Sequence, residues 1–331
     1  MQTIMQKHLL ILSLLLITAC TQDQPAAIIE LPAVADDVVV GDDGSDNKLR
    51  AIFQAAALLP FERVELALDP AINIATVSSI ASDAAGNFYI IHRGEESDSI
   101  IVTDPQGRIL RNFGAGLFAR PHTIRLDEAG NIWTVDSTSS MIRKFTPLGA
   151  QLLEISVGNL PEPMRDSCGT SDIAFADNGN VFVSDGYCNA RIIEYDARGQ
   201  KLNEWGSPGL GPGEFNLPHA ISISPEGNVY VADRENGRIQ WFTQEGTFLG
   251  EWHFGGRILS ITFSPSGNLY IGAEPKGANS MQEGYILQLE LQNREVLGKI
   301  PGFAHALGIS DSGIILGGSL TEKITLYFPS Q

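Results

Sequence analysis

A pattern of turn followed by strand recurs along the chain from about residue 75 to its end. Each copy is a turn that ends in Gly-Asn, followed at once by a strand of apolar and aromatic residues. Five clear copies have their turn glycines at Gly86, Gly130, Gly179, Gly227 and Gly267, and a degenerate sixth has Gly313. Asn and Gly tolerate the positive φ angles of tight turns, so each copy predicts a β-hairpin.

The spacing of these turns predicts the fold. Successive turn glycines are roughly 45 residues apart, the length of one four-stranded propeller blade. No sustained helical period occurs, except in the segment 49–59 ahead of the first repeat. Six copies close naturally into a ring, whereas an open solenoid needs capping units. We therefore expect an all-β, six-bladed β-propeller over residues 61–331, with the strand 61–68 completing the last blade.

The amino terminus has the pattern of a secretory signal. Its apolar run, 9–17, is too short for the ~20 residues that a membrane-spanning helix needs. The run leads into Ile17-Thr18-Ala19-Cys20, which resembles the lipobox of bacterial lipoproteins. We expect residues 1–19 to be a signal peptide and Cys20 to be lipidated, with a plain secreted start as the alternative.

The next segment, 21–60, is expected to be an acidic flexible tether, because residues 21–48 are polar, alanine-rich and free of aromatics. The expected protein is a monomer in the bacterial cell envelope, held to a membrane by its lipid alone. With Thr21 directly after the cysteine, the outer membrane is the expected location, where the protein would face the periplasm or the cell surface. The net charge of −17 argues against a nucleic-acid partner, which requires a basic footprint.

Two cysteines remain after Cys20, namely Cys168 and Cys188. A chain that leaves the reducing cytoplasm with an even pair of cysteines is expected to form a disulfide, and two separate buried thiols are the alternative.

Three histidines share one position within the repeat. His122, His219 and His305 each lie the same distance before the turn glycine of repeats two, four and six. The innermost strand of a blade lines the central channel, so alternate blades place three imidazoles around the axis. A zinc site with an open fourth position requires this arrangement. A single histidine would more simply be a hydrogen-bonded structural residue, and the equivalent positions in the odd repeats are Ser78, Ser171 and Leu259.

Arg93 and Tyr187 each follow a predicted strand, where the chain emerges at one end of the channel. From position alone, the simpler interpretation is that Arg93 is a surface cation and Tyr187 an aromatic residue at the rim of the channel.

The body, about residues 75–330, resembles the NHL-type propeller of the peptidyl-α-hydroxyglycine α-amidating lyases (peptidylamidoglycolate lyases). The resemblance is carried by His92-Arg93-Gly94, Pro121-His122, Val183 to Asn189, Pro218-His219 and Val231 to Arg238. Several of these stretches are long and unlike generic NHL repeats, which often only bind partners.

The resemblance implies roles for the residues singled out above. His122, His219 and His305 would bind a catalytic zinc, Arg93 and Tyr187 would carry the chemistry, and Cys168 would pair with Cys188. The family reaction splits a peptidyl-α-hydroxyglycine into a peptide amide and glyoxylate. Zinc would polarise the substrate hydroxyl, and Tyr187, its pKa depressed by Arg93 and the metal, would accept the hydroxyl proton as a phenolate.

The sixth repeat departs from the family pattern. The family's structural calcium uses two backbone carbonyls, which map onto Ile80 and Ile124, and a carboxylate directly after the third histidine, where this chain has Ala306. Calcium prefers charged oxygen ligands, so its binding is expected to be severely weakened. Phe303 replaces a methionine of the family.

Other functions remain open. The leading expectation is a zinc lyase acting on a small peptide or a related α-hydroxyamide, and the main alternative is a non-catalytic NHL propeller that scaffolds an envelope complex. Calcium-dependent hydrolysis of a lactone or ester needs several acidic or amide oxygens at the axis, which the sequence lacks. No hydroxylating domain is recognisable, so another protein or the surroundings must supply the hydroxylated substrate.

Overall fold

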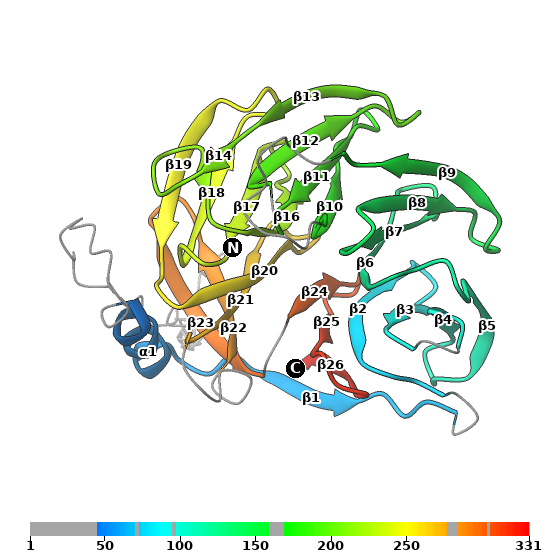
Figure 1. Ribbon diagram of the computed structural model, residues 1–331. Coiled ribbons are helices and arrows are strands. Elements are labelled where there is room, and N and C mark those ends of the chain that lie inside the picture. Colours follow the sequence, from blue (N-terminus) through cyan, green and yellow to red (C-terminus); the bar gives the residue numbers. More distant parts are fainter. Residues whose placement is uncertain are drawn as a thin grey trace, which may run out of the picture.

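The computed structural model describes residues 45–69, 73–94, 97–158, 169–187, 189–276, 284–302 and 305–330. Within these residues, six four-stranded antiparallel sheets form the blades of a β-propeller (Figure 1). The prediction of an all-β, six-bladed propeller is confirmed. The predicted signal peptide 1–19, Cys20 and the tether up to residue 44 lie outside the described residues.

The first three blades follow one another along the chain, each built from its innermost strand outward. Blade 1 contains β2 (Val77–Ser82), β3 (Phe88–His92), β4 (Ile100–Thr103) and β5 (Ile109–Phe113). Blade 2 contains β6 (Pro121–Leu126), β7 (Ile132–Asp136), β8 (Met141–Phe145) and β9 (Gln151–Ser156). Blade 3 contains β10 (Asp172–Phe175), β11 (Val181–Asp185), β12 (Arg191–Tyr195) and β13 (Lys201–Trp205).

The second half repeats this order, with one short insertion. A parallel pair, β14 (Ser207–Pro208) and β15 (Glu214–Phe215), precedes blade 4. Blade 4 contains β16 (Pro218–Ile223), β17 (Val229–Asp233), β18 (Arg238–Phe242) and β19 (Phe248–His253). Blade 5 contains β20 (Arg257–Phe263), β21 (Leu269–Glu274), β22 (Tyr285–Glu290) and β23 (Glu295–Pro301). The innermost strands of neighbouring blades contact one another around the axis.

Blade 6 closes the ring with strands from both ends of the chain. It contains β24 (Ala306–Ile309), β25 (Ile315–Gly318), β26 (Ile324–Pro329) and, from the amino-terminal side, β1 (Phe61–Glu65). β1 pairs antiparallel with β26, from Phe61 opposite Pro329 to Glu65 opposite Thr325 (Figure 1). The predicted closing strand is confirmed, although it ends at Glu65 rather than at residue 68.

The Gly-Asn turns have a local chemical cause. In blade 1, the Asp83 carboxylate accepts hydrogen bonds from the backbone N–H groups of Ala85 and Asn87, and Gly86 has a φ of 81°. Only glycine adopts this φ without strain, and the aspartate satisfies the turn's free N–H groups. A turn with a glycine of positive φ recurs in each blade and fixes where the innermost strand ends, so residues of equal phase occupy equivalent positions.

One prediction for the amino-terminal segment is wrong. Residues 45–60 are not a flexible tether, because Ser45–Ala55 form helix α1 on the outside of the propeller (Figure 1). Leu49, Ile52 and Phe53 are buried in an apolar cluster that they share with residues of blades 4 and 5. These apolar residues lie on one helical face, so their burial holds the helix on the propeller. Among the described residues, no helix has the length and hydrophobicity to cross a membrane.

Candidate metal centre

The three predicted histidines meet at the axis of the propeller. His122 lies in β6 and His219 in β16, each as the second residue of an innermost strand, and His305 directly precedes β24. All three side chains are buried, and their candidate ligand nitrogens lie within 4.8 Å of one another. Their ring centroids are 4.7 to 5.1 Å apart. The prediction that alternate blades bring these imidazoles together is confirmed.

Backbone carbonyls of the neighbouring blades orient two of these rings. His122 Nδ1 donates to the carbonyl of Ser171 at 2.6 Å, and His219 Nδ1 donates to the carbonyl of Leu259 at 2.5 Å. Because a carbonyl only accepts, Nδ1 carries the proton and Nε2 keeps its lone pair. This is the second-shell arrangement that fixes the tautomer of metal-binding histidines.

His305 is oriented less tightly than the other two histidines. Burial lowers the pKa of His305, and the Ser78 backbone opposes this effect as a hydrogen-bond acceptor. Nδ1 nevertheless makes no regular hydrogen bond with the described residues. Ser78, Ser171 and Leu259 are the residues of the odd blades that share the phase of the histidines. Their contacts with the histidines are made by the backbone, and these contacts need no particular side chain.

All three imidazoles are neutral at ordinary pH. Burial, the neighbouring His305 and Arg93 hold the pKa of His122 well below its usual range, and burial, His305 and Arg234 do the same for His219. Burial and the Arg93 guanidinium lower the pKa of His305 to about 3. Neutral imidazoles with free Nε2 lone pairs are the form that binds a transition metal, so the residues present fit a three-histidine zinc site.

Tyr187 reaches this cluster from blade 3. Its hydroxyl lies 2.7 Å from Nε2 of His122 and 3.1 Å from Nε2 of His219. Since both nitrogens are acceptors, the phenol donates its single proton to one of them at a time. The hydroxyl thus lies on the side toward which two of the Nε2 lone pairs point.

A glycine allows Tyr187 to approach so closely. A Cβ atom on Gly186 would lie 1.9 Å from the carbonyl oxygen of Pro218, the residue before His219. The N–H of Tyr187 also donates to the carbonyl of Gly169 at 3.1 Å. Close backbone contact between the loop after β11 and the start of β16 therefore brings the phenol to the histidines.

The pKa of Tyr187 differs from the expectation. Burial raises the pKa of the phenol, and this effect outweighs the guanidinium groups of Arg234, Arg93 and Arg120, which lower it. Arg93 lowers the pKa of Tyr187 as predicted, but Arg234 lowers it more. Without a metal, Tyr187 is therefore protonated at neutral pH.

Arg93 is fixed between blades 1 and 2. Its Nε donates to the Ser78 hydroxyl at 2.8 Å, and that hydroxyl donates to the carbonyl of Pro121 at 2.9 Å. Pro121 directly precedes His122, so Arg93 is attached to the backbone that carries the first histidine. It makes no ion pair with a carboxylate among the described residues, and its charge acts on His122, His305 and Tyr187.

Two further arginines at the site were not predicted. Arg234 follows β17 and forms an ion pair with Glu235 at 2.8 Å, while Arg120 precedes Pro121. Arg234 lies as far after Gly227 as Arg93 lies after Gly86, so the repeat phase that identified the histidines also contained a signal for Arg234. Arg120 shows no comparable regularity.

The residues that the resemblance maps onto a calcium site fit calcium poorly, in line with the expected weak binding. Ile124 lies in β6 and Ile80 in β2, and Ala306, the first residue of β24, offers no carboxylate beside them. The carbonyl of Ile124 instead accepts a long hydrogen bond of 3.4 Å from Nη1 of Arg125. Two carbonyls without a charged oxygen are a poor calcium site. Cys168, Cys188 and Phe303 lie outside the described residues.

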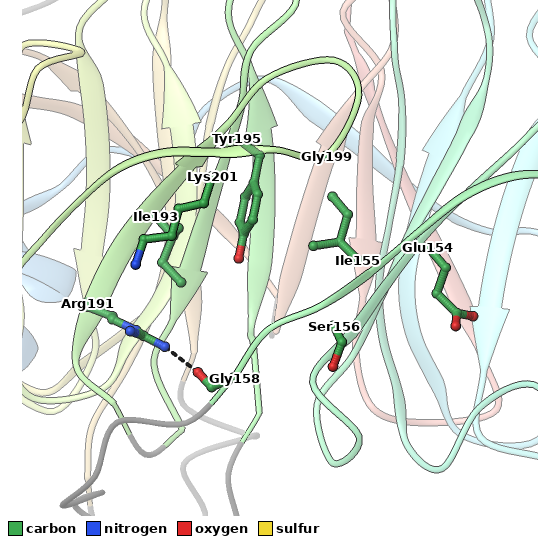
Figure 2. Close-up of a pocket in the computed structure, with 9 residues that line it drawn as sticks. All are labelled: Glu154, Ile155, Ser156, Gly158, Arg191, Ile193, Tyr195, Gly199 and Lys201. Carbon is green, nitrogen blue, oxygen red and sulfur yellow. Dashed lines mark hydrogen bonds between the residues drawn. The ribbon is translucent and has the colours of Figure 1, made fainter.

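A separate hollow of about 490 Å³ lies between blades 2 and 3 (Figure 2), and none of the three histidines lines it. Its lining residues are Glu154, Ile155, Ser156, Gly158, Arg191, Ile193, Tyr195, Gly199 and Lys201. Arg191 bonds Asp185 at 2.9 Å, Glu204 at 2.8 Å and the carbonyl of Gly158. Its charge is therefore already matched within the protein, and the hollow contains none of the candidate catalytic residues.

The chain is similar to known amidating enzymes. A model of the NHL repeat matches residues 215–242. Peptidyl-glycine alpha-amidating monooxygenase of Mus musculus is 32% identical over 248 residues, which are 64% of this chain and 25% of that protein. Peptidyl-alpha-hydroxyglycine alpha-amidating lyase 1 of Drosophila melanogaster is 30% identical over 267 residues, 66% of this chain and 49% of that protein.

These matches cover only part of each relative. The chain spans between a quarter and about half of the length of the curated relatives just described. Among solved structures, a streptogramin B lyase has a TM-score of 0.59 at 18% identity, with 82% of this chain and 98% of that chain covered. At this level of identity the structural likeness supports the propeller fold alone.

Proposed function

We propose, since this chain belongs to the family of the peptidyl-α-hydroxyglycine α-amidating lyases, that it is a zinc-dependent lyase. It cleaves the C–N bond of a peptidyl-α-hydroxyglycine, or of a related α-hydroxyamide, to an amide and glyoxylate. The observation that carries the proposal is the contact of the Tyr187 hydroxyl with Nε2 of both His122 and His219. A propeller that only scaffolds other proteins has no need of a phenol hydroxyl held against two buried, neutral imidazoles.

His122, His219 and His305 would hold the metal ion through their Nε2 atoms. Carbonyl oxygens orient the Nδ1 atoms of His122 and His219, and all three pKa values are lowered, so no proton competes with the metal at neutral pH. When bound, zinc supplies a Lewis acid for the substrate hydroxyl and a local positive charge.

Tyr187 is the proposed general base. In the metal-free site burial keeps its phenol protonated, while Arg234, Arg93 and Arg120 lower its pKa. The further positive charge at the histidines favours the phenolate by the same electrostatic effect. The phenolate then accepts the proton of the substrate hydroxyl.

The arginines give the site a preference for an anion. Arg93 and Arg234 both act on the buried cluster, in a protein whose net charge is −17. A guanidinium binds a carboxylate through two parallel hydrogen bonds, so these groups suit the carboxylate of the α-hydroxyglycine. A fixed carboxylate would align the hydroxyl with Tyr187.

The bond changes balance without an external nucleophile. The electron pair of the former O–H bond forms the C=O bond of glyoxylate as the C–N bond breaks. The amide nitrogen leaves with the electron pair of the broken C–N bond and takes up the proton that Tyr187 accepted. The products are the peptide amide and glyoxylate, and Tyr187 returns to its phenolate form.

The test is product formation from a synthetic α-hydroxyglycyl peptide. Zinc-loaded protein should release equal amounts of amide and glyoxylate, and the His122→Gln variant should release neither above background. A wild-type protein that binds zinc and releases no glyoxylate from peptides or simple α-hydroxyamides contradicts the proposal. A non-catalytic envelope propeller would then be the better description.

We further propose that the protein is a lipid-anchored monomer of the bacterial cell envelope. The support is the sequence Ile17-Thr18-Ala19-Cys20 after an apolar run. Metabolic labelling with a radioactive fatty acid should mark the wild-type protein and leave Cys20→Ala unlabelled. Equal labelling of both proteins, or of neither, contradicts the anchor.

A further inference from the structure

A buried ion pair lies directly behind the metal centre. Asp172, the first residue of β10, follows Ser171, whose carbonyl orients His122. One carboxylate oxygen of Asp172 accepts a hydrogen bond from Arg125 Nη2 at 2.9 Å. The other oxygen accepts a hydrogen bond from the backbone N–H of Ile173 at 2.9 Å. The side chain of Asp172 is 3% exposed and that of Arg125 is 17% exposed.

This carboxylate connects the innermost strands of three blades. Arg125 belongs to β6 in blade 2, and Asp172 to β10 in blade 3. The N–H of Ile221, in β16 of blade 4, donates to the same oxygen as Arg125 at 3.3 Å. β6 carries His122 and β16 carries His219, so the pair joins the strands that present two of the three metal ligands.

The positive charge of Arg125 compensates the buried carboxylate of Asp172. Burial raises the pKa of the Asp172 carboxyl, and Arg125 is the strongest influence that lowers it. A buried carboxylate that loses its cation is left uncompensated, which is strongly destabilising. The site therefore requires a fixed positive charge between the blades.

The Arg125 guanidinium lies beside one of the two carbonyls that the resemblance maps onto a calcium site. The calcium of the resembling family would use the carbonyls of Ile80 and Ile124 and a carboxylate where this chain has Ala306. Here Arg125 Nη1 contacts the Ile124 carbonyl at 3.4 Å while Nη2 bonds Asp172. A guanidinium is thus the cation beside one of these two carbonyls, and its carboxylate partner comes from blade 3.

We infer that the Arg125–Asp172 ion pair takes the place of a structural calcium ion and positions His122 and His219 for metal binding. The fold and the metal affinity of this chain are then independent of calcium and dependent on Arg125. Arg125 is a positioning residue, because it acts on the histidines through Asp172 and the strands and touches no reacting atom.

Two measurements on the mature protein test this inference. The first is the melting temperature of metal-free protein in chelator-treated buffer, with and without millimolar calcium. The second is the zinc affinity, measured by competition with a chromophoric chelator. Wild-type protein should melt at the same temperature in both buffers.

Arg125→Met should lower the melting temperature by about 10 °C and weaken zinc binding by about tenfold or more. Arg108→Met is the matched control, since Arg108 forms an ion pair with Asp104 at 2.6 Å on the outside of blade 1 and is 76% exposed. This variant should change neither value appreciably. If Arg125→Met fails to fold, Arg125→Lys retains the charge without the planar fork and should show an intermediate loss of zinc affinity.

The double variant Arg125→Ser/Ala306→Asp restores a carboxylate beside the two carbonyls and removes the guanidinium. Its melting temperature should rise on addition of calcium. Calcium stabilisation of the wild type, or an Arg125→Met variant that matches Arg108→Met in zinc affinity and melting temperature, overturns the inference. Neither measurement involves catalysis, so failure of the proposed lyase activity would leave the result interpretable.

Discussion

The hydroxyl of Tyr187 lies 2.7 Å from Nε2 of His122, although the two residues come from different blades and are 65 positions apart in the chain. Nδ1 of the same histidine donates to the carbonyl of Ser171. His122 therefore holds its proton on the side of the backbone and presents a lone pair to the phenol. The imidazole of His122 thus contacts the Ser171 backbone through Nδ1 and the candidate base through Nε2, the atom proposed to bind the metal.

Removal of the Tyr187 hydroxyl should abolish proton transfer without removing the metal ligands. Tyr187→Phe is expected to reduce kcat by about 10²- to 10⁴-fold, the usual contribution of a positioned base. Its zinc content should equal that of the wild type. Tyr195→Phe is the control, because Tyr195 is a buried tyrosine of the same blade that lies by the separate hollow. A Tyr187→Phe variant with at least half of the wild-type kcat would exclude the phenol as the base.

The arginines should control the pH at which Tyr187 becomes active. Arg234 lowers the pKa of the phenol more than Arg93 does. Activity that depends on the phenolate rises with pH through the pKa of Tyr187, so loss of a guanidinium should move this rise to higher pH. Arg234→Met should therefore shift the rising limb of kcat/KM further than Arg93→Met. Profiles that coincide with that of Arg108→Met contradict this electrostatic role.

Gly186 should be required for the position of Tyr187. A Cβ atom at Gly186 would collide with the Pro218 carbonyl at 1.9 Å, so Gly186→Ala must move the loop or the start of β16. We expect a loss of stability of about 1–3 kcal/mol and a fall in kcat of about 10²-fold, because the base is misplaced. Gly158→Ala is the control, since nothing lies within 4 Å of its Cβ position. Circular-dichroism melts and glyoxylate assays of both variants distinguish the outcomes, and equal behaviour of the two variants refutes the close-contact explanation.

The metal-free protein should lose stability as the pH falls. A histidine in the unfolded chain has a pKa of about 6.5, whereas the buried His305 has a pKa of about 3. Between these values the unfolded chain binds more protons, so the free energy of unfolding decreases toward lower pH by about 1.4 kcal/mol per pH unit for each such histidine. Urea unfolding at a series of pH values measures this slope.

His305→Gln should make that slope shallower by the contribution of one proton. His253→Gln is the control, since His253 is 45% exposed and lies in β19 at the outside of blade 4. A slope that is the same for wild type and His305→Gln would show that this histidine is not buried in its neutral form.

Much of the fold and part of the site could be predicted because the repeat converts sequence position into spatial position. The turn glycines set the phase, and from the phase His122, His219 and His305 could be assigned to equivalent places near the axis. The same comparison contains a signal for Arg234, which matches Arg93 in phase. Helix α1 was also accessible, because Leu49, Ile52, Phe53 and Ala56 follow a helical period, although the acidic segment before them favoured a tether.

Other features had no signature in the sequence. Ser171 and Leu259 orient the histidines through backbone carbonyls, which every residue possesses, so their side chains indicate nothing. The Arg125–Asp172 pair depends on two side chains from different blades whose distance is set only by the closed ring. The pKa of Tyr187 depends on the depth of its burial, which the phase of the repeat does not determine.

Zinc titration of the metal-free protein, with the rate of glyoxylate release from an α-hydroxyglycyl peptide as the readout, tests the central claim most directly. The rate should rise in proportion to added zinc and stop rising at one zinc per chain, and Tyr187→Phe should bind the same single zinc while releasing glyoxylate at least about 10²-fold more slowly. A wild-type chain whose glyoxylate release is absent throughout the titration, or is unaffected by zinc, would contradict the account.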